Sequence, residues 1–386
     1  MKEKTALVVG AGKEGKGFLG ESFSAAGWHL YFLDKDEKVI ENLNKGSYRV
    51  KLHKTDSTVI RTIKDYTAYL CDEKVSCQQA VNDADLITLC LYPEDIPDAA
   101  HYLGDALTVR AASNEKPLTI ISCTNKNHII NNITQWFRDG LKNEAAKEWF
   151  DRNVVVRDAI VRRSTDAKTN YDLDVETIVI APLLVQGPIN VDVSDLDQIE
   201  LTDDLEQLKE IKLYTINAPH ATCAYAGYLK GYKTIPEAEK DPAIAGLMKK
   251  VVTQSIHALS KEYNIDEERL WSFATLAIPL EEMADEIFRV CLDPVRKLSK
   301  NDRLTGNVLF CWKHNVDPDP FYRSIANAMM YTESRDEKAV YIQKLRAEKG
   351  DIEAIAQICG VANDSPLVVQ VSAYMKEIEK SGQPMV

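Results

Sequence analysis

Apolar residues in the first half of the chain form short continuous runs that alternate with segments of helical spacing. Such runs are typical of parallel strands buried on both faces and connected by helices. The expected strands are Thr5–Val9, His29–Leu33, Leu86–Leu91 and Thr119–Cys123, with further β-rich segments at Val154–Val161 and Val175–Ile180 and a helix over Gly17–Ala26. The alternation predicts an α/β fold with a doubly wound, mostly parallel sheet.

The second half has a different pattern. Apolar residues recur at helical spacing in Ala243–Tyr263, Asp351–Cys359 and Leu367–Ile378, which predicts amphipathic helices. An acidic stretch from Asp192 to Asp204 precedes this half. We therefore predict an α/β domain over residues 1–200 and a mostly α-helical domain over residues 201–386.

The composition narrows the possible functions. A net charge of −12 argues against wide contact with nucleic acid, which requires a basic surface. No run approaches the roughly 20 apolar residues that span a bilayer, and the N-terminus shows no secretion leader. The eight cysteines lack the spacing of a zinc site. These features predict a cytoplasmic protein with free thiols, no metal and small-molecule partners.

A glycine-rich hexamer follows the first expected strand: Gly10-Ala11-Gly12-Lys13-Glu14-Gly15. In this context the pattern G-x-G-x-x-G indicates a dinucleotide site. Gly10 permits a tight turn, Gly12 lets the backbone approach a pyrophosphate, and Gly15 lets the helix pack on the strand. The helix N-terminus then offers unpaired N–H groups to the anion. These residues, with Lys13 and Glu14, are the candidate cofactor-binding residues.

Asp34 ends the second expected strand, 22 residues after Gly12. A carboxylate there accepts hydrogen bonds from the ribose hydroxyls and repels a 2′-phosphate, so NAD is favoured over NADP. The neighbouring Lys35 weakens that preference, because a basic residue beside the carboxylate can accompany NADP. FAD is a further alternative, which the helical second half disfavours.

The second half also contains a candidate catalytic set, Lys212, Asn217 and His220. On a regular helix these three residues fall within an arc of about 140°. Pro219 cannot donate to the preceding turn, so the helix must kink there or begin near Asn217 as an N-cap. A lysine of lowered pKa can remove a hydroxyl proton while an amide and an imidazole hold the oxygen. Taken alone, the set is more often a solvated lysine and a buried ring.

The spacing K-x4-N-x2-H resembles that of the polyol-specific long-chain dehydrogenases, the mannitol dehydrogenase family. The similarity extends over nearly the whole chain and includes Gly10–Gly20, Asp34, Asn44–Val50, Ser122–Asn125 and Pro294–Leu304. The last segment is most similar to the mannitol-1-phosphate branch. Departures from that branch, such as Tyr92, Val161 and Leu292, leave the exact polyol open.

The resemblance implies a Rossmann domain, a helical C-terminal domain and a substrate cleft between them, without zinc. It also implies that Lys212 is the general base, that Asn217 and His220 position the alcohol, and that Asn125 helps to polarise its oxygen. The expected reaction interconverts a linear polyol, or its phosphate, and the ketose with NAD, with mannitol 1-phosphate and fructose 6-phosphate as the favoured pair.

A basic cluster bears on whether the substrate carries a phosphate. Arg296, Lys297 and Arg303 are candidate phosphate ligands in an otherwise acidic chain, because an arginine guanidinium matches phosphate geometry. The alternative is a solvated helix face neutralised by Asp293 and Asp302. Two other functions stay open: a dehydrogenase of an unphosphorylated polyol or sugar acid, and a dinucleotide-binding regulator without turnover. The family leans towards monomers and dimers.

Overall fold

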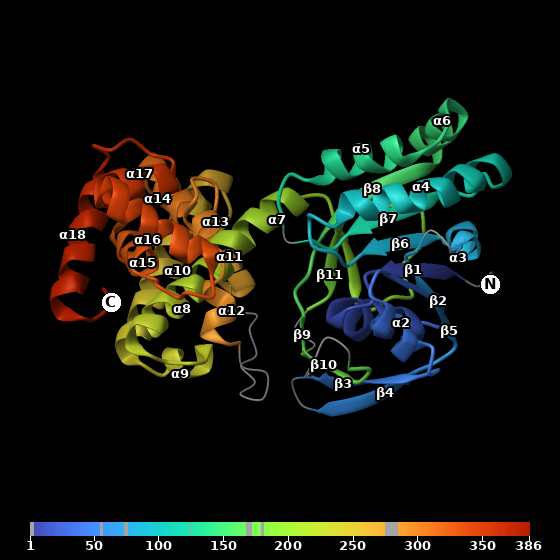
Figure 1. Ribbon diagram of the computed structural model, residues 1–386, viewed down its shortest axis with the longest axis horizontal. Helices are drawn as coiled ribbons and strands as arrows, with labels where there is room; N and C mark the ends of the chain where they lie inside the picture. Colours follow the sequence, from blue (N-terminus) through green and yellow to red (C-terminus); the bar gives the residue numbers. More distant parts are fainter. Residues whose placement is uncertain are drawn as a thin grey trace. The chain divides into compact units, whose positions relative to one another are not determined.

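The computed structural model describes residues 4–54, 57–72, 76–124, 126–166, 172–178, 181–274 and 285–386. The chain forms two compact units, Met1–Gln207 and Leu208–Val386 (Figure 1).

The N-terminal unit is built on an eight-stranded sheet of order β12-β11-β8-β7-β6-β1-β2-β5 (Figure 1). The strands are β1 (Thr5–Val9), β2 (His29–Asp34), β5 (Tyr66–Leu70), β6 (Leu86–Leu89), β7 (Leu118–Ser122), β8 (Val154–Ile160), β11 (Leu183–Gln186) and β12 (Ile199–Thr202). Neighbouring strands are parallel except β8 and β11. The expected strands of the first half thus lie in this sheet, with one exception given below.

Helices cover both faces of this sheet, which explains the continuous apolar runs. Ala6 and Val8 of β1 pack in one core with Phe18 and Phe23, from the helical segment after the glycine loop, whereas Leu7 packs on the opposite face. The first face is covered by η1 (Gly15–Gly20), α1 (Glu21–Ala25) and α2 (Glu37–Leu43); the second by α3 (Gln78–Asp83), α4 (Ile96–Ser113), α5 (Ile130–Gly140) and α6 (Glu144–Asn153). The predicted doubly wound α/β fold is confirmed.

A second sheet of four strands has the order β4-β3-β10-β9. It comprises β3 (Tyr48–His53), β4 (Thr58–Ile63), β9 (Ser164–Asp166) and β10 (Val175–Ile178). The β-rich segment Val175–Ile180 was expected to extend the main sheet, but its described part, β10, lies here; residues 179 and 180 lie outside the described residues. The reason is Glu176, which pairs with Lys51 at 3.1 Å and His53 at 2.8 Å. A sheet covered on both faces has no place for these polar groups.

The C-terminal unit is helical. Its elements are α7 (Leu205–Lys212), which begins just before the unit, then η2 (Leu213–Asn217), α8 (Ala218–Lys230), α9 (Ile235–Glu239), α10 (Pro242–Tyr263), α11 (Glu267–Ala274), α12 (Ile287–Cys291), α13 (Pro294–Leu298), α14 (Thr305–His314), α15 (Asp319–Met329), α16 (Glu337–Lys349), α17 (Asp351–Cys359) and α18 (Pro366–Ser381). The three helices predicted from periodicity are present as α10, α17 and α18. The predicted helical class of this half is confirmed.

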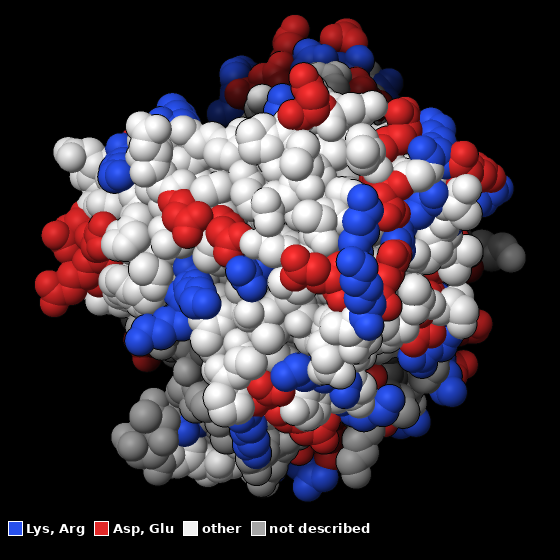
Figure 2. Space-filling view, turned by 90° about the vertical axis from the view of Figure 1, so that its left-hand side faces the viewer, with Lys and Arg blue, Asp and Glu red and all other residues white. Residues whose placement is uncertain are grey.

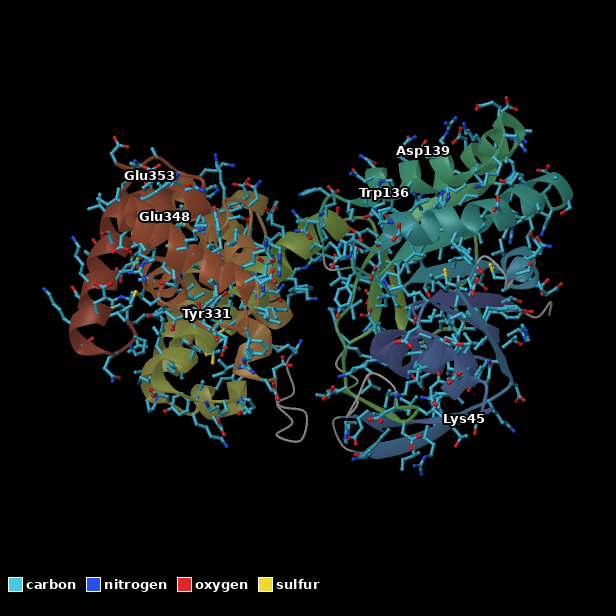
Figure 3. The ribbon with its side chains drawn as sticks, viewed as in Figure 1. Lys45, Trp136, Asp139, Tyr331, Glu348 and Glu353 are labelled. Atoms are coloured by element: carbon cyan, nitrogen blue, oxygen red, sulfur yellow. The ribbon has the colours of Figure 1, made fainter. Side chains whose placement is uncertain are left out.

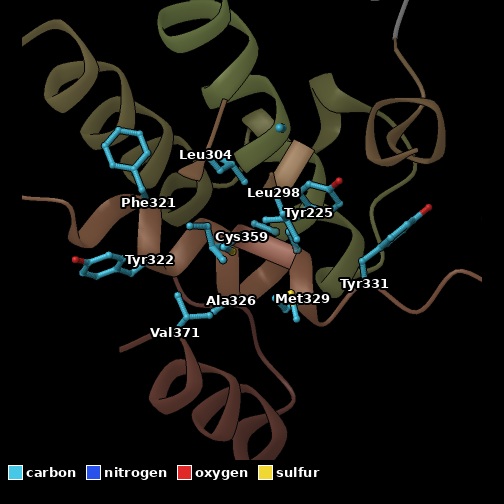
Figure 4. Packing of buried hydrophobic residues seen from close by; sticks show 14 of the residues in the cluster. Tyr225, Leu298, Leu304, Phe321, Tyr322, Ala326, Met329, Tyr331, Cys359 and Val371 are labelled. Carbon is cyan, nitrogen blue, oxygen red and sulfur yellow. The ribbon is translucent and has the colours of Figure 1, made fainter. Parts of the chain in front are cut away.

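Aromatic residues fill the core around α8. The Tyr225 ring packs edge-on against Tyr331 with ring centroids 5.6 Å apart, and both residues are labelled in Figure 4. Figure 3 shows Tyr331 within the whole chain. The Tyr225 hydroxyl donates to the Cys291 carbonyl at 2.9 Å. The interior of this unit therefore fixes α8, the helix that carries His220, against α12 and the segment after α15.

Charges of both signs are interspersed over the face of the C-terminal unit in Figure 2. Arg346, for example, pairs with Asp351 at 2.8 Å and with Glu379 at 2.9 Å. Among the described residues, none of the helices is both long and apolar enough to cross a membrane.

Candidate active site

The glycine loop connects β1 to η1 with close packing at its two ends. Gly10 has a φ of +93°, and a Cβ there would lie 2.3 Å from the Cys90 carbonyl oxygen. A Cβ on Gly15 would lie 2.0 Å from the Gly10 carbonyl oxygen. At Gly12, by contrast, a Cβ would meet no described atom within 4 Å. The loop is thus tight where the fold requires it and open where a pyrophosphate would approach the backbone.

Asp34 lies beside this loop at the end of β2. Its carboxylate accepts hydrogen bonds from the Ala11 amide at 2.7 Å and the Asp36 amide at 2.9 Å. Lys35, which raised the possibility of NADP, forms an ion pair with Asp95 at 2.6 Å. The Asp34 carboxylate is therefore held beside the glycine loop, while the neighbouring Lys35 ammonium is paired with Asp95. These residues fit NAD.

Two lysines of the glycine motif have protein partners. Lys13 pairs with Asp166 at 2.6 Å. Lys16 is 2% exposed, and its ammonium donates to the Asp172 carbonyl at 2.7 Å. Burial lowers the pKa of Lys16, against the opposing effect of Asp34 and Asp172. Sequence reasoning missed Lys16, although its place in the turn after Gly15 was a signal that it faces the loop. Glu14 stands directly before η1, in its N-cap position.

The helical run from α7 through η2 to α8 carries the lysine, asparagine and histidine. Lys212 is the last residue of α7, η2 is a π turn, and Asn217 is in the N-cap position of α8. Asn217 keeps helical dihedral angles (φ −77°, ψ −26°), and its side chain makes no capping bond to the described residues. Because a π turn closes i→i+5 bonds, residues five apart lie closer to one face than on an α-helix. Lys212 and Asn217 are such a pair, and His220 follows one turn later.

Pro219 lies just after the π turn, five residues after Tyr214. It has no N–H, so it cannot donate to a carbonyl of the preceding turn. The Tyr214 carbonyl instead accepts from the Ser255 hydroxyl at 3.0 Å and the Asn307 amide at 3.5 Å. Ser255 of α10 and Asn307 of α14 are completely buried. Two helices distant in the sequence therefore hold the turn that separates Lys212 from Asn217, and no local sequence pattern marks Ser255 or Asn307.

His220 lies among cations. Burial, Arg289 and Arg303 lower the pKa of His220 to about 4, with a smaller effect from Lys297. Asp285 lies 3.5 Å from the ring nitrogen, but Arg289 pairs with the same carboxylate. The imidazole is therefore neutral near pH 7, so it can donate one hydrogen bond and accept another.

The three candidate phosphate ligands lie in different environments. Arg296 is exposed and pairs with Asp293 at 3.1 Å and with Asp302 at 3.3 Å. Arg303 pairs with Asp302 at 2.8 Å and is mostly buried. Lys297 is 5% exposed, and its ammonium donates to the Val290 carbonyl at 2.8 Å and to the Leu292 carbonyl. Burial and the two arginines lower the pKa of Lys297 to about 7.

The structure therefore brings His220 and the basic cluster together, and it places Lys212 and Asn217 on the same helical run. Asn125, expected to help polarise the substrate oxygen, lies outside the described residues.

Comparison with known proteins identifies the chain. A Rossmann unit with a glycine loop and a terminal aspartate defines the class of dinucleotide-binding proteins. Residues 4–214 match the family described as Mannitol dehydrogenase Rossmann domain, and residues 204–380 match Mannitol dehydrogenase C-terminal domain. The chain belongs to the mannitol dehydrogenase family. The predicted family is confirmed, and with it the expected dehydrogenase class and NAD as its cofactor.

Curated relatives are similar over almost the full length. The chain is 29% identical to "Mannitol-1-phosphate 5-dehydrogenase" of Caldanaerobacter subterraneus subsp. tengcongensis, covering 97% of this chain and 98% of the relative. The protein of the same name from Thermoanaerobacter pseudethanolicus is also 29% identical, with the same coverage.

Two solved structures share the fold. Pseudomonas fluorescens mannitol 2-dehydrogenase, solved as a ternary complex with NAD and D-mannitol, has a TM-score of 0.74 at 17% identity and covers 98% of this chain and 92% of that one. A D-sorbitol dehydrogenase in substrate-free form has a TM-score of 0.77 at 15% identity, covering 98% and 94%.

Proposed function

We propose that the protein interconverts a linear polyol phosphate and its ketose phosphate with NAD, with mannitol 1-phosphate and fructose 6-phosphate as the pair. The observation that carries this proposal is the position of His220. It lies on the helical run that carries Lys212, and the positive charges of Arg289, Arg303 and Lys297 act on its ring. A neutral hydrogen-bonding ring beside two arginines suits an alcohol on a carbon chain that ends in an anion. The names of the curated relatives support the same substrate.

The chemistry follows from these side chains. NAD, when bound, accepts the hydride that leaves the carbinol carbon. Lys212 removes the hydroxyl proton at its Nζ, and the Asn217 amide and the His220 ring hold the oxygen as its negative charge develops. Asn125 takes part in the same polarisation. In the reverse direction Lys212 returns the proton to the alkoxide.

The cofactor residues have separate tasks. The open backbone at Gly12 admits the pyrophosphate, and the Asp34 carboxylate accepts from the ribose hydroxyls. Lys13 and Glu14 lie in the same loop. If the ribose contact is correct, Asp34→Ser lowers the ratio of NADH to NADPH activity, while an unchanged ratio refutes it.

The decisive experiment is a reductase assay with NADH over phosphorylated and free ketoses. We expect turnover of fructose 6-phosphate, and we expect Lys212→Ala to abolish it while NADH binding persists, because the base acts on the substrate. Lys250→Ala, an exposed lysine of α10, is the matched control and should retain activity. Equal turnover by Lys212→Ala and the parent would refute the role of the base. NADH binding without reduction of any ketose would favour the regulator instead.

A second candidate function rests on one observation. Asp293 and Asp302 already neutralise Arg296, and Asp302 also pairs with Arg303. Arginines compensated in this way attract an anion less strongly, which favours an unphosphorylated, uncharged polyol. Higher kcat/KM for free fructose than for fructose 6-phosphate would establish it.

The remaining expectations belong to the same proposal. The boundary between the two domains lies near residue 200, with the residues for cofactor binding before it and those for proton transfer after it. All eight cysteines are free thiols, which supports a cytoplasmic site of action. We propose that the protein works as a monomer or dimer.

A further inference from the structure

Two cysteines and a glutamate meet at the carboxyl edge of the main sheet. Cys90 directly follows β6 and Cys123 directly follows β7, and these two strands are neighbours (Figure 1). Leu89 and Ser122 are paired in the parallel register, so the two cysteines occupy the next pair of positions. Glu14 belongs to the glycine loop. Sequence reasoning missed this cluster because no short spacing connects its members.

The backbone holds the cluster in place. The Cys90 amide donates to the Val9 carbonyl at 2.8 Å, and the Cys123 amide donates to the Leu89 carbonyl at 3.0 Å. The Gly10 loop packs directly on Cys90, because a Cβ on Gly10 would meet its carbonyl oxygen. The strands and the loop thus fix three side chains from three separate segments.

The geometry is that of a metal-binding site. One ligand atom from each of Glu14, Cys90 and Cys123 lies within 4.8 Å of the others. Sulfur atoms that share one zinc ion at about 2.3 Å are about 3.8 Å apart, so closure of the site requires a shift of no more than about 1 Å. Cys123 is buried, and the other two side chains are half-buried. The three ligand atoms therefore lie close enough together for a small movement to bring them to one ion.

The ligand types select a class of cation. Two sulfurs and one carboxylate prefer a thiophilic divalent ion such as Zn²⁺ or Cd²⁺ over Mg²⁺ or Ca²⁺, which require oxygen ligands. Three protein ligands leave a fourth position open.

We propose that Glu14, Cys90 and Cys123 bind a thiophilic divalent cation, and that this cation and the dinucleotide exclude one another. The exclusion rests on the proposed function. A dinucleotide in this fold crosses the carboxyl ends of the strands at the glycine loop, which is where the three ligand atoms converge. The cation also ties Glu14 to the strand ends, which restrains the loop that must admit the pyrophosphate. The site is inhibitory, and none of its three ligands is a residue that transfers the proton.

Cadmium is the probe, because cadmium–thiolate bonds absorb in the ultraviolet. We expect the parent protein, without NADH, to gain a thiolate absorption that saturates with cadmium and to lose most of it in Cys90→Ala/Cys123→Ala. Alanine is chosen because it suits a buried position better than serine. Cys71→Ser, a half-buried cysteine of the same unit, is the control and should retain the parent's signal. Equal absorption in the double variant and the parent would overturn the site.

The second measurement is the Kd for NADH with and without saturating cadmium, taken as a ratio within each protein. We expect a ratio of at least 10 in the parent and in Cys71→Ser, and a ratio near 1 in the double variant and in Glu14→Gln. A ratio near 1 in a parent that binds cadmium would overturn the exclusion. A parent that binds cadmium but never NADH would contradict the proposed function and leave the metal site standing. If the double variant fails to fold, as judged by circular dichroism, Cys123→Ala alone serves the same comparison.

Discussion

Removing one hydrogen bond to the π turn tests whether this turn supports the fold, the reaction or both. Ser255→Ala removes the hydroxyl that donates to the Tyr214 carbonyl at 3.0 Å, and leaves that carbonyl with the Asn307 amide at 3.5 Å. The remaining distance is at the limit of a hydrogen bond. In the five-residue register of the π turn, the residue that would donate to this carbonyl is Pro219, which has no N–H.

The expected loss of stability follows from the burial of Tyr214, whose carbonyl loses its hydroxyl partner. A buried acceptor left without a good partner costs about 1–3 kcal/mol. For a unit of about 180 residues, 1 kcal/mol shifts the unfolding midpoint by roughly 2–4 °C, so we expect a fall of about 2–12 °C. The turn also sets the spacing of Lys212 and Asn217. A displacement of about 1 Å at such a site can cost on the order of 100-fold in rate, so we expect kcat to fall by at least about 10-fold.

Thr253→Ala is the matched control. Thr253 lies on the same helix and donates to the Lys249 carbonyl at 2.8 Å, the same backward bond that Ser255 makes to Val251 at 2.9 Å. Thr253 is half-buried but its hydroxyl bond is exposed to solvent, so its loss should change the free energy of unfolding by less than about 0.5 kcal/mol. Thermal unfolding and steady-state kinetics measure both variants.

The unfolding midpoint, kcat and the Kd for NADH together show what the π turn supports. We expect Ser255→Ala to lower the unfolding midpoint and kcat while the Kd for NADH is unchanged, because the cofactor residues belong to the other unit. A Ser255→Ala protein as stable and as active as Thr253→Ala would refute the reasoning. A loss of stability with full kcat would show that the turn is held for the fold alone.

Three further predictions concern the two sites. Gly12→Ala should fold with the parent's stability but bind NADH at least about 10-fold more weakly, whereas Gly15→Ala should lower the unfolding midpoint because its Cβ would lie 2.0 Å from a carbonyl oxygen; equal stability of the two would contradict this assignment. Arg303→Ala should raise KM for a phosphorylated ketose far more than KM for a free ketose. Lys297→Met should lower the unfolding midpoint and change the ratio of these two KM values little, because the Lys297 ammonium donates to two backbone carbonyls. An effect on KM equal to that of Arg303→Ala would place Lys297 at the phosphate. Burial and two arginines lower the pKa of His220 from 6.5 to about 4, so as the pH falls the unfolded chain is protonated at His220 before the folded chain is. The free energy of unfolding therefore decreases as the pH falls from about 6.5 towards 4. Urea unfolding at pH 7 and pH 5 should show a smaller decrease in His220→Gln than in the parent.

The sequence predicted the parts of the fold whose causes are local. Thr5–Val9 and Asp351–Cys359 were predicted with the observed bounds, because glycines flank them at Gly10, Gly350 and Gly360. The small sheet was not predicted. Its strand β10 is short and half polar, and it depends on pairing with β3, far away in the sequence.

The same distinction holds for the candidate site. The glycine loop was predictable because its tight turn, its helix start and Asp34 all lie within one supersecondary unit. The support of the π turn was not, because Ser255 and Asn307 come from helices that meet η2 only in the folded protein. The burial of Lys297 could not be predicted for a similar reason. Its partners are backbone carbonyls, which every residue has, so no residue type in the sequence indicates them.

The π turn also has a consequence for the length of the chain. Relative to an α-helix, a π turn acts as one inserted residue, and here the insertion lies between a proton acceptor and the groups that orient its substrate. Deleting a single residue from 213–217 would restore the α-helical repeat and leave the lysine four residues before the asparagine. Residues four apart on an α-helix share a face, so the two side chains would stay neighbours. The five-residue spacing of Lys212 and Asn217 is therefore matched to the π turn: a protein with one residue fewer and an uninterrupted α-helix would present the same two side chains on one face, whereas a protein with this spacing on an α-helix would not.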